Sequence, residues 1–159
     1  MAIIYESKYF NVLSAEQPLV DRNDGGHIII EPKERVSSRQ DLSAKEAIEL
    51  MRLTIVAGIA MEKVMSQNGV DIGRINYQDN GNWSVFKPQG PHLHYHLYGR
   101  AKNAKIQKYG QTLSMPHIDD HPEYYKDLKP LIKEDINGIR NEIGELLKEE
   151  KFSDQNWGL

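Results

Sequence analysis

Apolar and histidine residues alternate strictly over residues 92–97, which read His-Leu-His-Tyr-His-Leu. Successive side chains of a β-strand point to opposite faces of the sheet. Gly90-Pro91 precedes the run and Gly99 follows it, and both residue types commonly mark strand boundaries. We therefore predict a strand with three apolar side chains on one face and three imidazoles on the other.

Several further stretches have the composition of strands. β-Forming residues are scattered over residues 3–12, which predicts one or two short strands. Residues 27–31, closed by Pro32, and residues 74–78 predict two more. The polar, glycine-containing segments 20–26 and 79–83 predict turns.

Two segments show the three- and four-residue spacing of amphipathic helices. The first covers residues 44–67, with a Ser43–Glu46 capping box before it and Asn68-Gly69 at its end. The second covers about residues 133–150. The positions expected to face the core are Ala47, Leu50, Met51, Thr54, Ile55, Gly58, Met61 and Met65 in the first helix, and Ile136, Ile139, Ile143, Leu146 and Leu147 in the second.

Composition narrows the classes of protein that fit. The 159 residues are 39% hydrophobic and 27% charged, with a net charge of −3, which predicts a single globular domain over residues 1–159 and gives no basic surface for a nucleic-acid polymer. The absence of cysteine excludes disulfides and thiolate metal ligands. No basic-then-apolar leader follows Met1, and the apolar run 55–61 is shorter than the ~20 residues of a spanning helix. We expect a cytoplasmic protein that does not enter a membrane.

Three interpretations of the histidine face compete. The first is a half-buried strand whose polar face happens to be histidine. The second is a metal site, because imidazole is a common metal ligand. On a regular strand, however, the Cα atoms of His92 and His96 would be about 13 Å apart, so two histidines with an outside ligand would fit one ion better than all three.

The third interpretation is nucleophilic catalysis by the central histidine. A neutral imidazole can form covalent intermediates. One neighbour of His94 could fix its tautomer, while the other could carry a proton or a positive charge towards an anionic substrate. This arrangement suits chemistry at phosphorus.

The same residues resemble a known family. Residues 92–98 match, position for position, the His-φ-His-φ-His-φ-φ signature (φ, apolar) of the histidine triad superfamily of nucleotide hydrolases and transferases. Residues 26–33 are similar to that family's Gly/Thr-His-strand-Pro-Lys segment, and Val36 and Asp41-Leu42 follow at family-like spacing. In all, the resemblance covers about residues 9–100.

The resemblance implies a fold and a reaction. The fold is α+β, a mostly antiparallel sheet of about five strands with the long helix on one face, followed by a C-terminal helix and tail over about residues 123–159. His94 would attack the α-phosphorus of a nucleotide anhydride, ester or phosphoramidate and form a nucleotidyl-histidine. His96 would stabilise the phosphate oxygens or protonate the leaving group. His92 and His27 would orient the nucleophile, with His27 hydrogen-bonded to His92.

The family's phosphate-binding loop has a different sequence here. Gln89 occupies the register of a family hydroxyl, and the loop from Asn80 is longer, so Asn80, Asn82, Gln89 and Arg100 are our candidate substrate-binding residues. We expect a purine nucleotide as substrate, no obligatory cofactor or metal, and, from the family, a homodimer. Alternatives are a metal-dependent hydrolase that uses the histidine cluster and a non-catalytic nucleotide-binding module.

Three features of the C-terminal third lie outside the resemblance. Residues 101–110 are basic and form either a solvated loop or a rim that attracts outer phosphates. His117 and His121, with Asp119 and Asp120 between them, are surface residues or a weak metal site. We expect Trp157 to dock over a pocket or a partner subunit.

Overall fold

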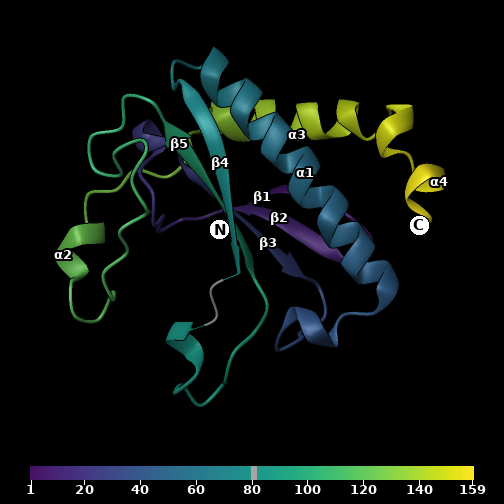
Figure 1. Ribbon diagram of the computed structural model, residues 1–159, viewed down its shortest axis with the longest axis horizontal. Helices are drawn as coiled ribbons and strands as arrows, with labels where there is room; N and C mark the ends of the chain where they lie inside the picture. Colours follow the sequence, from purple (N-terminus) through teal and green to yellow (C-terminus); the bar gives the residue numbers. More distant parts are fainter. Residues whose placement is uncertain (80–81) are drawn as a thin grey trace.

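The computed structural model describes residues 1–79 and 82–159, so Asn80, one of the candidate substrate-binding residues, lies outside the described part. A single antiparallel sheet has the strand order β1-β2-β3-β5-β4, which confirms the predicted α+β class (Figure 1). The strands are β1 (Ala2–Glu6), β2 (Phe10–Ser14), β3 (His27–Pro32), β4 (Ile72–Asp79) and β5 (Tyr95–Ala101). The helices are α1 (Ala44–Gln67), α2 (Pro122–Tyr125), α3 (Lys133–Leu146) and α4 (Asp154–Trp157), with short 3₁₀ turns at Arg22–Asp24, Arg39–Asp41, Asn82–Ser84 and Glu150–Phe152.

Helix α1 has the ends that its sequence predicts. The Ser43 hydroxyl accepts from the Glu46 amide, and the Ser43 amide donates to the Glu46 carboxylate at 2.8 Å. These bonds satisfy backbone amides that the first turn leaves without partners. The helix ends at Gln67 with Asn68 as its C-cap, and Gly69 follows with a φ of +88°, a conformation that glycine adopts without steric cost.

Helices α1 and α3 pack against each other on one face of the sheet, with α1 next to β4 and α3 next to β1 (Figure 1). The predicted core face of α3 is confirmed, because Ile139, Ile143 and Leu146 are buried. The predicted stripe of α1 was wrong at Ala47, which is exposed, and at Met51, which is 55% exposed. Helix α1 packs against both the sheet and α3. A wider arc of its surface is therefore buried than contact with the sheet alone would bury. The buried apolar residues absent from the prediction are Leu53, Val56, Ala57, Ala60 and Val64.

The triad strand begins later than predicted. Regular pairing in β5 starts at Tyr95, opposite Ile30 of β3 and Asp79 of β4. Residues 92–94 precede this pairing, yet the Leu93 amide donates to the Val36 carbonyl at 2.8 Å and the Leu93 side chain is buried. The alternation of faces therefore continues ahead of the strand.

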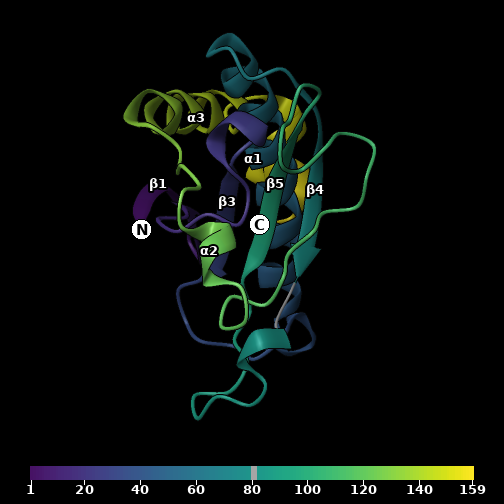
Figure 2. The ribbon, with the colours of Figure 1, turned by 90° about the vertical axis from the view of Figure 1, so that its left-hand side faces the viewer.

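Residues 102–130 cover part of the sheet face opposite α1, and α2 of this segment lies in front of that face in Figure 2. The turn before β3 anchors the segment: the buried Asp24 carboxylate accepts from the amides of Lys105, Ile106 and Gln107 at 2.7–2.8 Å. The same turn touches β5 where Gly99 meets Gly25. A Cβ atom on Gly99 would lie 2.2 Å from the Gly25 carbonyl oxygen, so this contact requires a glycine.

The C-terminal tail packs on its own chain. The Trp157 indole Nε1 donates to the Lys151 carbonyl at 2.9 Å, and the half-buried ring rests against the core. In the described part of the chain, no helix is long and apolar enough to cross a bilayer.

Candidate active site

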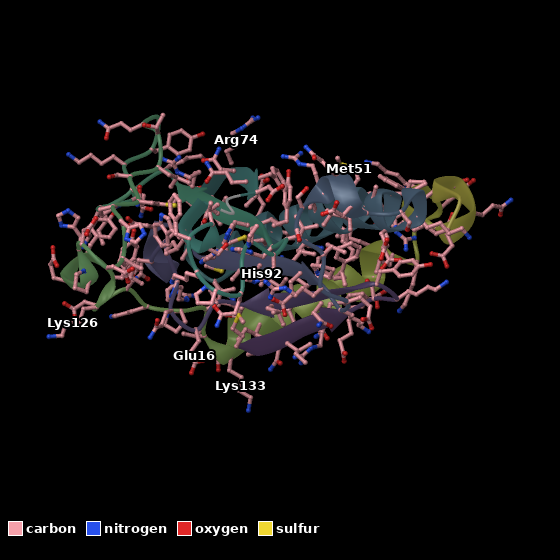
Figure 3. All side chains as sticks on the ribbon, turned by 90° about the horizontal axis from the view of Figure 1, so that it is seen from below. Glu16, Met51, Arg74, His92, Lys126 and Lys133 are labelled. Carbon is pink, nitrogen blue, oxygen red and sulfur yellow. The ribbon has the colours of Figure 1, made fainter. Side chains whose placement is uncertain are left out.

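The structure brings the three predicted imidazoles together on the sheet face opposite α1. Ring centroids are 4.7 Å apart between His92 and His94, and 4.7 Å apart between His94 and His96. Leu93 and Leu97, which alternate with the histidines, are buried in the core on the other side. In Figure 3 the labelled His92 lies in the middle of the molecule, between Arg74 on one side and Lys133 on the other.

A hydrogen bond determines which nitrogen of His94 is free to react. Its Nδ1 lies 2.9 Å from the carbonyl oxygen of His92. A carbonyl oxygen can only accept, so this bond requires the proton on Nδ1. In the neutral ring, Nε2 then carries the lone pair, as a nucleophile needs.

A second set of hydrogen bonds sets the tautomer of His96. The Leu19 amide, which can only donate, lies 3.1 Å from Nδ1 of His27. The other nitrogen of His27, Nε2, therefore holds its proton and donates to Nδ1 of His96 at 2.8 Å. His96 must in turn carry its own proton on Nε2, which leaves that atom as a hydrogen-bond donor.

The expectation that His27 pairs with His92 was wrong, because its partner is His96. Sheet register explains the difference: His27 is opposite Tyr98, and Ile29 is opposite His96. His27 thus lies diagonally next to His96 on one face, within reach of its ring. His92 precedes the last residue pair of β3 with β5, Ile30 with Tyr95.

Burial keeps much of this cluster uncharged. It lowers the pKa of His27 well below the usual value and, with the nearby His94, lowers the pKa of His96 to about 3. Burial, His94 and Arg35 also lower the pKa of His92. At neutral pH His96 is therefore a neutral ring that donates an N–H. A positively charged ring, the other form expected from the sequence, does not fit this lowered pKa. The Tyr98 ring stacks on His96 with centroids 5.4 Å apart.

Arg35 is a residue near the site that sequence reasoning missed. Its Nη2 lies 2.6 Å from the Gln89 carbonyl oxygen and within 3.3 Å of the Gly90 and Pro91 carbonyl oxygens. It therefore holds the segment that leads into the triad. A basic residue shortly after Pro32 was the only signal in the sequence, and it does not reveal this contact.

The predicted substrate-binding residues are dispersed. Gln89 is exposed, and its carbonyl accepts from Arg35. Asn82 begins the 3₁₀ turn Asn82–Ser84, but its side chain, like Asn80, lies outside the described part. Arg100 is buried six residues along the chain from His94. Its guanidinium donates to Asn76 Oδ1 at 2.8 Å and to the carbonyl oxygens of Lys108 and Gln111 at 3.0 and 2.7 Å.

The histidines of the 102–130 segment have other contacts. The His117 ring packs on Trp83 with centroids 5.0 Å apart. This contact joins the turn before the triad to residues 102–130, the covering segment. The His121 Nδ1 lies 3.3 Å from the Glu123 carboxylate. Within residues 1–79 and 82–159, no three His, Cys, Asp or Glu side chains are grouped so that they could hold a metal ion.

No protein-family model matches the sequence, and no curated protein matches it. Solved structures do match. A hypothetical histidine triad nucleotide-binding protein from Sulfolobus tokodaii superposes with a TM-score of 0.59 at 17% identity, covering 93% of this chain and 87% of that one. A zinc-bound histidine triad family protein from Mycobacterium smegmatis gives 0.58 at 16%, with 91% and 84% covered.

A third structure, the diadenosine triphosphate hydrolase of Plasmodium falciparum, superposes with a TM-score of 0.54 at 16% identity, covering 95% of this chain and 78% of that one. At such low identities the likeness is one of fold. The chain therefore has the histidine triad fold, as residues 26–33 and 92–98 suggested.

Proposed function

We propose that the protein is a nucleotide hydrolase or nucleotidyl transferase that acts at an α-phosphate through a nucleotidyl group on His94. The observation that carries this proposal is the 2.9 Å hydrogen bond between His94 Nδ1 and the His92 carbonyl, because it leaves Nε2 of His94 with its lone pair. The fold, shared with a diadenosine triphosphate hydrolase, supports a nucleotide anhydride, ester or phosphoramidate as substrate. From the family resemblance, we propose a purine nucleotide.

The proposed reaction has two displacements at phosphorus. Nε2 of His94 forms a P–N bond as the bond from the α-phosphorus to the leaving group breaks. The leaving group takes the bonding electron pair. Water, or another acceptor, then attacks phosphorus and gives up a proton as the P–N bond breaks, which releases the nucleotide and restores His94.

The neighbouring residues have distinct parts in this proposal. The Nε2–H of His96 donates to a non-bridging phosphate oxygen, in a position set by His27. A preorganised donor that is largely out of water is effective against developing charge. Arg35 adds positive charge at the His92 end of the triad. The proposal requires no cofactor, because the nucleophile and the donors are side chains of this chain.

The proposal is tested by His94→Ala and His94→Gly. Each variant should lose at least about 10³-fold in turnover of a diadenosine polyphosphate or an adenosine phosphoramidate, because the nucleophile is removed. Each should still fold, by circular dichroism, and bind adenosine monophosphate. His121→Ala, which changes an exposed histidine outside the triad, is the matched control. Undiminished turnover in the His94 variants would exclude the assignment.

Mass spectrometry tests the covalent step itself. Wild-type protein mixed with substrate and quenched in alkali should carry one nucleoside monophosphate on His94. The alternative of a metal-dependent hydrolase is worth testing because a structure of similar fold contains zinc. Such an enzyme would instead lose activity with a chelator and regain it with Zn²⁺. A non-catalytic module would bind the mononucleotide without turnover.

We also propose a homodimer formed through α1 and β4. β4 is an edge strand, and α1 beside it exposes Met51 and Ile59, while Tyr77 of β4 is 43% exposed. Tyr77 reaches α1 at Gly58, where a Cβ would lie 2.0 Å from its hydroxyl oxygen, so these apolar residues form one surface. Light scattering should give twice the 18.3 kDa chain mass, and Ile59→Glu should give the monomer mass, whereas Lys133→Glu on α3 should not.

A further inference from the structure

Next to the triad lies a cavity of about 450 Å³ between β4 and residues 109–113. Its floor is formed by Arg74, Asn76 and Gln78 of β4 and by Arg100 of β5. Gln78 is directly opposite His96 in the sheet, and paired residues share a face. The cavity therefore begins beside the triad and extends about 13 Å along β4 to Arg74, at ~3.3 Å per residue.

Two arginines face each other across this floor. Arg74 and Arg100 are paired in the β4–β5 register, and like charges in this position destabilise a sheet. Within the described part of the chain, neither forms an ion pair with a carboxylate, and the Arg74 side chain forms no hydrogen bond. No aspartate or glutamate lines the cavity. Among residues 1–79 and 82–159, the pair thus has no carboxylate as a counter-charge.

The missing counter-charge matters most for Arg100, because its side chain is buried. It is only 6% exposed, its guanidinium contacts neutral oxygens, and its buried Nε–H has no acceptor among the described residues. A buried charge normally has an ionic partner, because an unpaired one costs free energy. An anion in the cavity would supply that partner and would also neutralise Arg74 at the rim.

We propose that this cavity binds a phosphate of the leaving group, so that the substrate is a nucleotide anhydride whose leaving group itself carries phosphate. The inference rests on the proposed function. When His94 Nε2 forms its bond to the α-phosphorus, the P–O bond to the bridging oxygen breaks. Its electron pair stays on the departing phosphate, which needs no proton to leave. Arg74 and Arg100 stabilise the negative charge that this group gains.

The test compares two substrates that differ in leaving group. Diadenosine triphosphate releases a nucleoside diphosphate, whereas adenosine 5′-phosphoramidate releases an uncharged amine. Arg74→Gln should lower kcat/KM for the triphosphate by about 10-fold, the loss expected for one charged hydrogen bond, and leave the phosphoramidate within about twofold. Arg74 is exposed, and its side chain forms no hydrogen bond or ion pair with the described residues, so its replacement should not unfold the protein.

Lys133→Gln is the control for a simple loss of positive charge. Lys133 is exposed on the opposite side of the molecule from Arg74 (Figure 3), and its variant should retain wild-type kinetics with both substrates. Equal losses with both substrates in Arg74→Gln, or no loss with either, would overturn the inference.

A binding measurement separates this inference from the proposed function. Inorganic triphosphate titrated into the wild-type protein by calorimetry should bind saturably, and about 10-fold more weakly to Arg74→Gln. If neither substrate is turned over, the proposed function fails while this difference in Kd still supports the anion site. No binding, or equal binding by both proteins, overturns the site.

Discussion

Nε2 of His27 lies 2.8 Å from Nδ1 of His96, so a residue outside the triad determines how one of its members presents its proton. The contact crosses from β3 to β5, between residues 69 positions apart. His27 is itself held by the Leu19 amide. The donor that we propose to face the phosphate is thus set by a backbone group.

Replacing His27 should act through His96. In His27→Ala the hydrogen bond that sets the His96 tautomer is lost, and we expect kcat to fall by about 10- to 100-fold, corresponding to 1.4–2.7 kcal/mol. Less desolvation should raise the pKa of His96 towards its usual value. Nuclear magnetic resonance titration of His96 should then show protonation at higher pH than in the wild type. An unchanged titration would contradict the positioning role.

Acid should destabilise the protein through the same two histidines. Their pKa values are lowered in the folded state, so the unfolded chain binds more protons below its histidine pKa of about 6.5. The free energy of unfolding should be unaffected by these two groups above pH 6.5. It should fall as the pH drops towards 3, by up to about 1.4 kcal/mol per pH unit for each group. Urea unfolding at several pH values measures this slope, which should be shallower in His27→Ala and unchanged in His121→Ala.

Asp24 should control attachment of the covering segment. Asp24→Ala removes the acceptor of three amides and should cost about 3 kcal/mol, given ~1–3 kcal/mol for a buried group left unsatisfied. Hydrogen exchange should accelerate over residues 102–113, which include the wall of the arginine-lined cavity, while α1 stays protected. Asp120→Ala, at an exposed loop position, should leave exchange unchanged. Equal protection in the two variants would show that other contacts hold the segment.

Local patterns in the sequence determined the helix ends and the face of the histidines. The Ser43–Glu46 capping box predicts the start of α1 because its bonds join residues three positions apart. The alternation over residues 92–97 predicts a shared histidine face because a pleated backbone has a period of two. These interactions depend on neighbours in the chain, so no knowledge of tertiary packing was needed.

Only the tertiary structure decided which groups from distant segments meet. Strand register and the packing of the layers decide three features: the pairing of His27 with His96, the hydrogen bonds of Arg35 to the carbonyls before the triad, and the exposure of Met51. The same holds for Arg74 and Arg100, whose like charges become neighbours only when β4 pairs with β5. Contacts between residues far apart in the chain leave no local periodicity, and for that reason they could not be predicted from the sequence.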